Sequence, residues 1–496
     1  MQGVIPRWEW RTFGAGFGRA ENAFAAAAPT QVQESDELYL LAGTEHNVKV
    51  RDDLMDIKVL REIDADGLER WEPVMKAAFP LPPEDATRVC EALDLASPRA
   101  GQTYPLDRFV AELVEPSGGV RVVRVHKRRA RYTIEGCMAE LTDVVANGGS
   151  TRTIAIESED ASAVVSAVRA VGLGGYINTS YPVGLSRLVE GRRPRYAVID
   201  VGTNSVKFHV GQRGDDGSWT TIVDRAELTR LGEGLEGRGE ISAEPLERTV
   251  AAIGGMVREA KRHDVVAIDA VGTAGLRIAA NRDDVLAAIR SVAGVSVEVI
   301  PGEEESRLAY LAVQTGLGLG EGALVVFDTG GGSSQFTFGR GSRVDERFSV
   351  DVGAVRYTER FGLDAEVSAE TLRDALAAIS DDLSRLDGRP APDALVGMGG
   401  AITNLMAVKH ELATYDPEVV QGAVLDRAEV DRQIELYRSR TAEARRAIVG
   451  LQPKRAEVIL AGACIVRTAM EKLRQERLTV SDRGLRHGVL IDRFGA

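Results

Sequence analysis

The feature that most constrains the fold is an internal repeat in the second part of the chain. Residues 198–205 (VIDVGTNS) and 326–333 (VFDTGGGS) share one template: two apolar residues, Asp, any residue, Gly, any two residues and Ser. The similarity continues beyond the template, where VKFHVG (206–211) aligns with SQFTFG (334–339). Each copy therefore predicts a buried strand that ends in Asp, a turn rich in Gly, Ser and Thr, and a returning strand.

Turns of this kind have the chemistry to hold phosphate. Gly202 and Gly330 carry no side chain, so backbone N–H groups and neighbouring hydroxyls can approach a phosphate closely. The carboxylates of Asp200 and Asp328, just before the turns, can hold a divalent cation directly or through water. Two such turns predict two subdomains that clamp one phosphate chain and its metal ion. The alternative is a pair of strand-ending turns that bind nothing.

A short Arg/Pro/Gly stretch at 190–195 (EGRRPR) separates two regions with different patterns of apolar and polar residues. The region before it carries short alternating or β-branched runs, at 47–51, 54–60, 120–132 and 151–157, and one helical segment at 160–171. After it, strands at 197–200, 265–271 and 324–328 alternate with helices at 244–263, 283–293, 303–315, 369–386 and 454–474. The second region therefore predicts an α/β architecture.

Composition excludes several classes of protein. The 496 residues suffice for several domains. With 61 Lys and Arg against 74 Asp and Glu, the net charge of −13 argues against nucleic acid or membrane partners for the whole protein. Three scattered cysteines do not form a disulfide framework or a zinc site. Because no apolar leader and no run of 18 apolar residues occurs, we expect a cytoplasmic protein without a membrane span.

Six motifs together resemble the Ppx/GppA family of exopolyphosphatases and guanosine pentaphosphatases. They are D200VGTNS, G272TAGLR, G302EEESRL, D328TGGGSSQ, G397MGGAITN and S481DRGLRHG, and the resemblance runs from Tyr196 to the end of the chain. It implies two ribonuclease-H-like subdomains of the actin-like ATPase superfold, at 196–320 and 321–496, with the phosphate site in the cleft. It also implies a homodimer.

The resemblance assigns roles to individual residues. Glu305 is expected to be the general base that activates the attacking water, and Arg277 to hold a phosphate oxygen. Asp200 and Asp328 are expected to carry Mg²⁺ or Mn²⁺. The expected phosphate binders are Gly202, Thr203, Asn204, Ser205, Gly330, Gly331, Gly332, Ser333 and Gln335. From the residues alone, the acidic triplet 303–305 can equally be the favoured negative charge at the start of a helix.

Gln335 departs from the family pattern, which commonly has a glutamate at this position. A neutral amide can orient water or phosphate but supplies no charge to a cation. Glutamine here, together with Thr-Ala-Gly-x-Arg at 273–277, also resembles the apyrases. Three hypotheses follow: an exopolyphosphatase-like hydrolase, which we favour, a hydrolase of guanosine pentaphosphate or other nucleotides, and a sensor of polyphosphate or nucleotide without turnover.

Basic residues at alternate positions mark the strands of the first region. Alternation places Lys49 with Arg51, Lys58 with Asp56, and Lys127 with Arg129 and Arg131 on single faces of their strands. If the sheet closes into a barrel, such faces predict a cationic lumen. The alternative is a solvated charged surface.

Residues 47–60, 126–132, 135–143 and 178–185 resemble the CYTH family of triphosphate tunnel enzymes. The resemblance implies that residues 1–190 form an α+β domain with an antiparallel tunnel or barrel that binds triphosphate or polyphosphate. The family's opening Glu-x-Glu-x-Lys is reduced here to Glu9-Trp10-Arg11, and Ala155 stands where an acidic residue is expected. We therefore expect this domain to capture polyphosphate and not to hydrolyse triphosphate.

Overall fold

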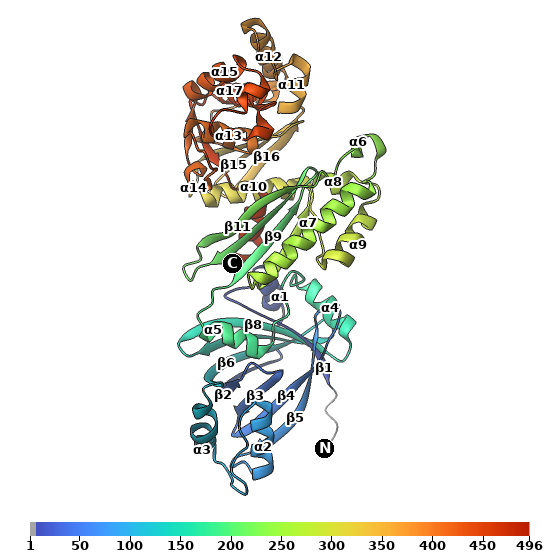
Figure 1. The fold of residues 1–496 in the computed structure, drawn as a ribbon, viewed down its shortest axis with the longest axis vertical. Helices are drawn as coiled ribbons and strands as arrows, with labels where there is room; N and C mark the ends of the chain where they lie inside the picture. Colours follow the sequence, from blue (N-terminus) through green and yellow to red (C-terminus); the bar gives the residue numbers. More distant parts are fainter. Residues whose placement is uncertain (1–5, 496) are drawn as a thin grey trace. The chain divides into compact units, whose positions relative to one another are not determined.

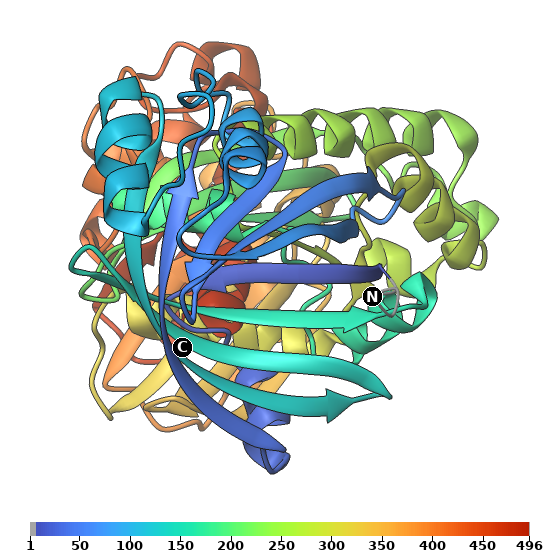
Figure 2. The same ribbon diagram turned by 90° about the horizontal axis from the view of Figure 1, so that it is seen from below.

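The computed structural model describes residues 6–495, and its first eight strands close into an antiparallel barrel. Around the barrel the strands follow the order β1-β5-β4-β3-β2-β6-β7-β8. In Figure 1 they run from blue to teal, and Figure 2 shows the same strands from below. Their bounds are β1 Arg7–Gly14, β2 Gln31–Leu41, β3 His46–Arg51, β4 Leu54–Ile63, β5 Glu69–Ala78, β6 Arg121–Ile134, β7 Cys137–Ala146 and β8 Gly149–Ser158.

Alternation along the strands gives the barrel two chemically different faces. On the outer face of β3 and β4, apolar side chains such as Val48 and Ile57 are buried together with residues of α2 (Pro83–Ala92) and with Phe109 of α3 (Leu106–Phe109). The neighbouring positions in the same strands carry Lys49, Arg51 and Lys58, which therefore face the lumen. Because apolar side chains are buried on the outer face, the sheet can fold although its lumen face carries many charges.

One end of the lumen is filled by apolar side chains. Phe13, Val125 and Val144 share the inward-facing parity of their strands and pack with residues of α5 (Tyr181–Val189). Gly184 permits the close approach of this helix, because a Cβ there would lie 2.3 Å from the Phe13 ring. Helix α5 therefore closes this end, and the charged part of the lumen opens at the other.

After helices α4 (Ala161–Ala170) and α5, the chain forms a five-stranded sheet in the order β11-β10-β9-β12-β13. Strand β9 pairs antiparallel with β10 and parallel with β12. The strands are β9 Arg195–Val201, β10 Ser205–Arg213, β11 Trp219–Leu228, β12 Ala267–Gly272 and β13 Glu298–Val299; the helices include α7 Ala243–Arg262, α8 Ala274–Ile278 and α9 Arg282–Ala293. By its contacts this sheet belongs with the barrel to one compact unit, Met1–Glu298 with Arg493–Ala496, called unit 1 below.

The second compact unit, Val299–Asp492, is called unit 2 and contains a six-stranded sheet in the order β16-β15-β14-β17-β19-β18. Its strands are β14 Ala323–Thr329, β15 Ser334–Arg340, β16 Arg343–Val350, β17 Ala394–Met398, β18 Val424–Asp426 and β19 Arg477–Ser481. Its helices include α10 Gly302–Gly316, α11 Ala354–Phe361, α12 Ala369–Asp382, α13 Gly400–Lys409, α15 Arg427–Arg438 and α17 Ile459–Lys472, and α18 spans Leu485–Phe494. Helix α17 packs against α11, α12, α13 and α15 in the centre of this unit's core.

The expected fold classes are confirmed, with shifts in two helices. The helix expected over 369–386 ends at Asp382 and is followed by a separate turn at Ser384–Leu386. The helix expected over 454–474 begins at Ile459, because Pro453 starts a separate 3₁₀ turn before it. The domain boundaries at 190, 196 and 320 stay predictions. Within residues 6–495, none of the helices is long and apolar enough to cross a membrane.

Candidate functional site

The two halves of the sequence repeat form hairpins with the same turn. In the first, the N–H of Gly202 donates to the carbonyl of Ser205 at 3.1 Å, and in the second the N–H of Gly330 donates to the carbonyl of Ser333 at 2.9 Å. The register places Asp200 opposite Lys207 in one hairpin and Asp328 opposite Gln335 in the other. The repeat is therefore structural, down to the hydrogen bond that closes each turn.

Asp200, at the end of β9, fits a divalent cation. Its side chain is buried, and its Oδ2 accepts a hydrogen bond from Lys207 Nζ at 2.9 Å. Its Oδ1 is buried without a hydrogen-bond partner among the described residues. A buried carboxylate oxygen left without a partner is costly. A metal ion bound directly or through water would satisfy this oxygen.

The predicted phosphate binders of unit 1 lie in one loop beside the start of α8. Thr203 and Asn204 are exposed, while their carbonyls accept hydrogen bonds from the N–H groups of Gly232 (2.8 Å) and Arg230 (2.9 Å). Gly275 packs on this loop, since a Cβ there would lie 3.0 Å from Thr203 Oγ1. Arg277 is half-buried on the same short helix. The structure thus brings the element that carries Arg277 next to the first turn.

The second turn, in unit 2, is fixed by backbone hydrogen bonds from the start of α11. The N–H groups of Ala354 and Val355, at the start of α11, donate to the carbonyls of Gly330 and Gly331, both at 2.9 Å. Gln335 Nε2 donates to Ser333 Oγ at 3.0 Å. The amide that replaces the family's glutamate therefore orients a hydroxyl of the turn.

The loop between β17 and α13 lies against Asp328. Gly399 has a φ of +91°, and a Cβ there would lie 2.1 Å from Asp328 Oδ1. Both the backbone conformation and the short distance require glycine. The G397MGGAITN motif therefore places a backbone without a side chain, at Gly399, beside Asp328, the second carboxylate expected to hold the metal ion.

Glu305 lies in the first turn of α10, where the three acidic residues differ in their partners. Glu303 forms an ion pair with Arg347. Glu304 accepts two hydrogen bonds from Arg307, both at 2.8 Å, and Arg307 also binds Asp492 at 2.7 Å. Glu305 is half-buried in the same turn. Its role as general base stays a prediction.

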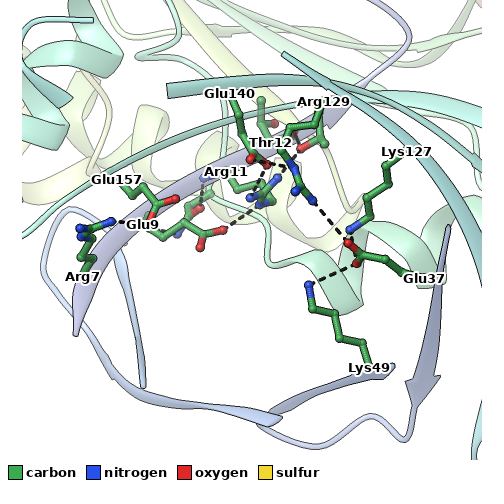
Figure 3. A network of polar contacts seen from close by, with 12 residues as sticks. Arg7, Glu9, Arg11, Thr12, Glu37, Lys49, Lys127, Arg129, Glu140 and Glu157 are labelled. Atoms are coloured by element: carbon green, nitrogen blue, oxygen red, sulfur yellow. Dashed lines mark hydrogen bonds and ion pairs between the residues drawn. The ribbon is translucent and has the colours of Figure 1, made fainter. Parts of the chain in front are cut away.

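The barrel lumen holds a second cluster of candidate residues, centred on Glu37 (Figure 3). This fully buried carboxylate is surrounded by four of the predicted cations: Lys127 Nζ at 2.8 Å, Lys49 Nζ at 3.2 Å, Arg129 Nη2 at 3.5 Å and Arg51 Nη1 at 3.9 Å. Burial raises the pKa of Glu37, but the charges of Lys127 and Lys49 outweigh it and hold this pKa far below its ordinary value. Burial and the charge of Lys49 lower the pKa of Lys127.

Arg11 joins the same network from β1 (Figure 3). Its Nε donates to Glu9 at 2.7 Å and its Nη2 to Glu140 at 3.0 Å, while Glu140 also lies 3.2 Å from Arg129 Nε. Burial raises the pKa values of Glu9 and Glu140. The Arg11 charge, together with Lys58 at Glu9 and with Arg129 and Lys127 at Glu140, outweighs burial, so both pKa values are lowered. The lumen is a continuous network of opposite charges and not a solvated surface.

The sequence identified the cations of the lumen and missed two of its carboxylates. Of the six predicted polyanion-binding residues, Lys58 faces the lumen without an ion pair to any described residue. Arg131 lies apart from the network and donates to Gln31 at 2.8 Å. Glu37 and Glu140 were not predicted. The available signal was their position in strands directly beside the basic strand β6.

Comparison with known proteins agrees with this architecture. The sequence profile of the Ppx/GppA phosphatase family matches residues 211–495. Exopolyphosphatase 2 of Mycobacterium tuberculosis is 28% identical over 326 residues, which cover 61% of this chain and 99% of that protein. Guanosine-5'-triphosphate,3'-diphosphate pyrophosphatase of Photobacterium profundum is 30% identical over 303 residues, covering 60% of this chain and 59% of that protein.

A solved structure extends the similarity to three dimensions. The Ppx/GppA family member of Aquifex aeolicus superposes with a TM-score of 0.56 at 33% identity, covering 60% of this chain and 96% of that one. The fold together with the named phosphatase relatives thus indicates an actin-like hydrolase of phosphoanhydride bonds, as expected from the sequence. Within that class, the chain belongs to the Ppx/GppA phosphatase family, whose profile covers more than half of it.

Proposed function

We propose that this protein is an exopolyphosphatase-like phosphohydrolase, which releases terminal phosphate from linear inorganic polyphosphate by attack of water. The observation that carries the proposal is the pair of equivalent Asp-Gly hairpins in a chain of this family. The similarity to an exopolyphosphatase over almost that protein's whole length supports the choice of substrate.

The proposed roles follow the chemistry that phosphoryl transfer to water requires. Glu305 positions and deprotonates the water, and Arg277 offers a planar fork of N–H donors to a phosphate oxygen. The two turns bind phosphate through backbone N–H groups and hydroxyls. Asp200 and Asp328 hold Mg²⁺ or Mn²⁺, which supplies positive charge against the phosphates when bound. A cytoplasmic location and a homodimer remain predictions.

Substitution of Glu305 tests the assignment of the base. We expect Glu305→Gln to lower phosphate release from long-chain polyphosphate by about 10²–10⁴-fold, the usual contribution of a general base, while polyphosphate binding is retained. Glu303→Gln is the matched control, because it removes the same charge from the same helical turn and from a residue paired with Arg347. Equal turnover of wild type and Glu305→Gln would overturn the assignment.

A nucleotide substrate is the second candidate. It is favoured by Gln335, which orients Ser333 without adding charge, and by the similarity to a guanosine pentaphosphate pyrophosphatase. Phosphate release from nucleoside triphosphates and guanosine pentaphosphate, with none from polyphosphate, would establish it. Tight binding without any release would instead indicate a sensor.

We also propose that the barrel captures the polyanion that the second region hydrolyses. The lumen cations Lys49, Arg51, Lys127 and Arg129, paired with Glu37, support this, as does Lys58, which faces the lumen; Arg131 lies apart from them. Substituting Arg51 and Lys58 together by Ala should weaken polyphosphate binding without changing the rate of phosphate release at saturation. A change in that rate with unchanged binding would contradict capture by the barrel.

A further inference from the structure

Arg11 occupies the middle of a carboxylate cluster in the barrel lumen. Its side chain is only 8% exposed and bridges Glu9 on its own strand and Glu140 on β7. Glu157 of β8 lies opposite Glu9 in the strand register. Glu69 of β5 lies opposite Glu9 on its other side. Four carboxylates thus gather near the open end of the lumen, and a guanidinium lies between two of them.

The triphosphate-tunnel resemblance implies a metal ion held by such carboxylates, and the residues present do not fit one. A divalent cation needs several oxygen ligands at close range. Here oxygens of Glu9 and Glu140 bind the guanidinium, which keeps its charge at every accessible pH. Directly opposite Arg11 in the register stands Ala155, which offers no ligand atom. A metal ion would have to displace a buried ion pair and then bear the repulsion of the cation.

We infer that the Arg11 guanidinium, at the lysine position of the family's Glu-x-Glu-x-Lys, binds the carboxylates that would hold a metal ion, and that the barrel binds linear polyphosphate without any divalent cation. The inference rests on the proposed capture of polyphosphate by the barrel and names its mode of binding. The protein carries the positive charge itself, on side chains fixed in the lumen.

The remaining cations are arranged to receive such a ligand. Side-chain exposure rises from 1% at Lys127 through 12% at Lys49 to 30% at Arg51, so the cations form a path from the open end inward. The contacts of Arg129 and Arg51 with Glu37, at 3.5 and 3.9 Å, are longer than strong charge-assisted hydrogen bonds. These two guanidinium groups can therefore turn N–H donors to phosphate oxygens while Lys127 keeps Glu37 neutralised. Lys58 adds a cation that forms no ion pair with a described residue and whose charge acts on Glu9 and Glu157.

The first test measures binding of labelled long-chain polyphosphate to the full chain with Glu305→Gln, so that turnover does not consume the ligand. Affinity is compared in EDTA and in Mg²⁺, with and without the Arg51→Ala and Lys58→Ala substitutions. We expect tight binding in EDTA, within about threefold of the value in Mg²⁺, and a loss of at least about tenfold in EDTA when the two cations are removed, since each phosphate contact contributes to affinity.

The outcomes separate this inference from the proposal on which it rests. Binding that depends on Arg51 and Lys58 but disappears in EDTA overturns the metal-free mode and leaves capture by the barrel intact. If the substitutions of Arg51 and Lys58 change the affinity neither in EDTA nor in Mg²⁺, the barrel does not capture polyphosphate, and the inference fails as well.

The second test counts Mn²⁺ ions. We expect Arg11→Gln, which removes the guanidinium, to bind one more Mn²⁺ per chain than wild type, and the double variant Arg11→Gln, Glu9→Gln to lose it. Circular dichroism and a melting curve establish that each variant is folded. An unchanged count in folded Arg11→Gln would contradict the inference, as would a wild-type ion that Glu9→Gln alone removes. If Arg11→Gln does not fold, the EDTA comparison decides, because it leaves Arg11 in place.

Discussion

Glu37 holds the interior of the barrel together, because four cations share its carboxylate. Breaking a buried ion pair by removing one partner costs about 3–5 kcal/mol, since charge is left buried and uncompensated. We expect Glu37→Gln to lower the free energy of unfolding of the barrel by that amount in urea denaturation. The control is Glu62→Gln, whose pair with Arg70 is exposed and contributes less than about 1 kcal/mol. Equal effects of the two substitutions would contradict the account.

The same carboxylate predicts a dependence of stability on pH. The pKa values of Glu37, Glu9 and Glu140 are lowered in the folded barrel from an ordinary value of 4.5. Groups with depressed pKa values stabilise the fold fully above that value, and the stabilisation is lost as the pH falls below it. Glu157 and Glu69 act in the opposite direction, because burial and the charge of Glu9 raise their pKa values.

We therefore expect the melting temperature of the barrel to fall below about pH 4.5, because the three lowered pKa values, that of Glu37 above all, outweigh the raised pKa values of Glu157 and Glu69. Glu37→Gln should be less stable at pH 7 and should lose less on acidification, since the substituted residue no longer titrates. Thermal melting between pH 3 and pH 8 measures both curves. Parallel curves for the two proteins would show that Glu37 is not the group responsible.

Among the elements, the loop from β17 to α13 depends most on a single residue. A methyl group at Gly399 would meet Asp328 Oδ1 and would strain a backbone with a φ of +91°. We expect Gly399→Ala to raise the Mg²⁺ concentration needed for half-maximal phosphate release by at least about tenfold, because the new methyl group displaces the Asp328 carboxylate that is proposed to hold the metal ion.

Gly388→Ala is the matched control for Gly399→Ala. Gly388 has a similar φ of +71°, but open space surrounds its Cβ position. The control therefore carries the backbone strain without the displacement of Asp328. Equal Mg²⁺ requirements in both variants would mean that strain alone, and not contact with Asp328, explains the effect.

The sequence predicted the elements that repeat or alternate, and missed those that depend on distant contacts. The hairpins around Asp200 and Asp328 followed from the template, because a turn is a local property of consecutive residues. The alternating cations of β3 and β6 followed from the period of a strand. The closure of one end of the lumen by α5 did not, because it depends on Gly184 of that helix meeting Phe13 of β1. Glu37 was missed because its contacts with Lys49 and Lys127 also join residues far apart in the sequence.

For the molecule as a whole, the last residues of the chain return to the first compact unit. Phe494 stacks on Tyr196 with ring centroids 4.7 Å apart, and Arg213 donates to the carbonyls of Phe494 and Gly495, both at 2.9 Å. No local pattern in the sequence indicates this return. The chain therefore crosses between the two units twice, at 298–299 and at 492–493.

We expect Phe494→Ala to destabilise unit 1 by about 3–5 kcal/mol, as for other buried aromatic residues replaced by Ala. Val449→Ala, at an exposed position of unit 2, is the control and should change the stability by less than about 0.5 kcal/mol. Hydrogen exchange of the amides in β9 and β10 reports on unit 1 directly. Unchanged protection in these strands would show that the return of the chain does not support the sheet.

In the proposed function, two equivalent phosphate hairpins serve the hydrolysis of linear polyphosphate. The most direct measurement is inorganic phosphate release by the full chain with Mg²⁺, with long-chain polyphosphate, ATP and GTP offered in parallel and Glu305→Gln as the inactive control. We expect release from polyphosphate that Glu305→Gln abolishes, and little release from the nucleotides. Release from nucleotides alone, or from none of the substrates while polyphosphate still binds, would contradict the proposed function.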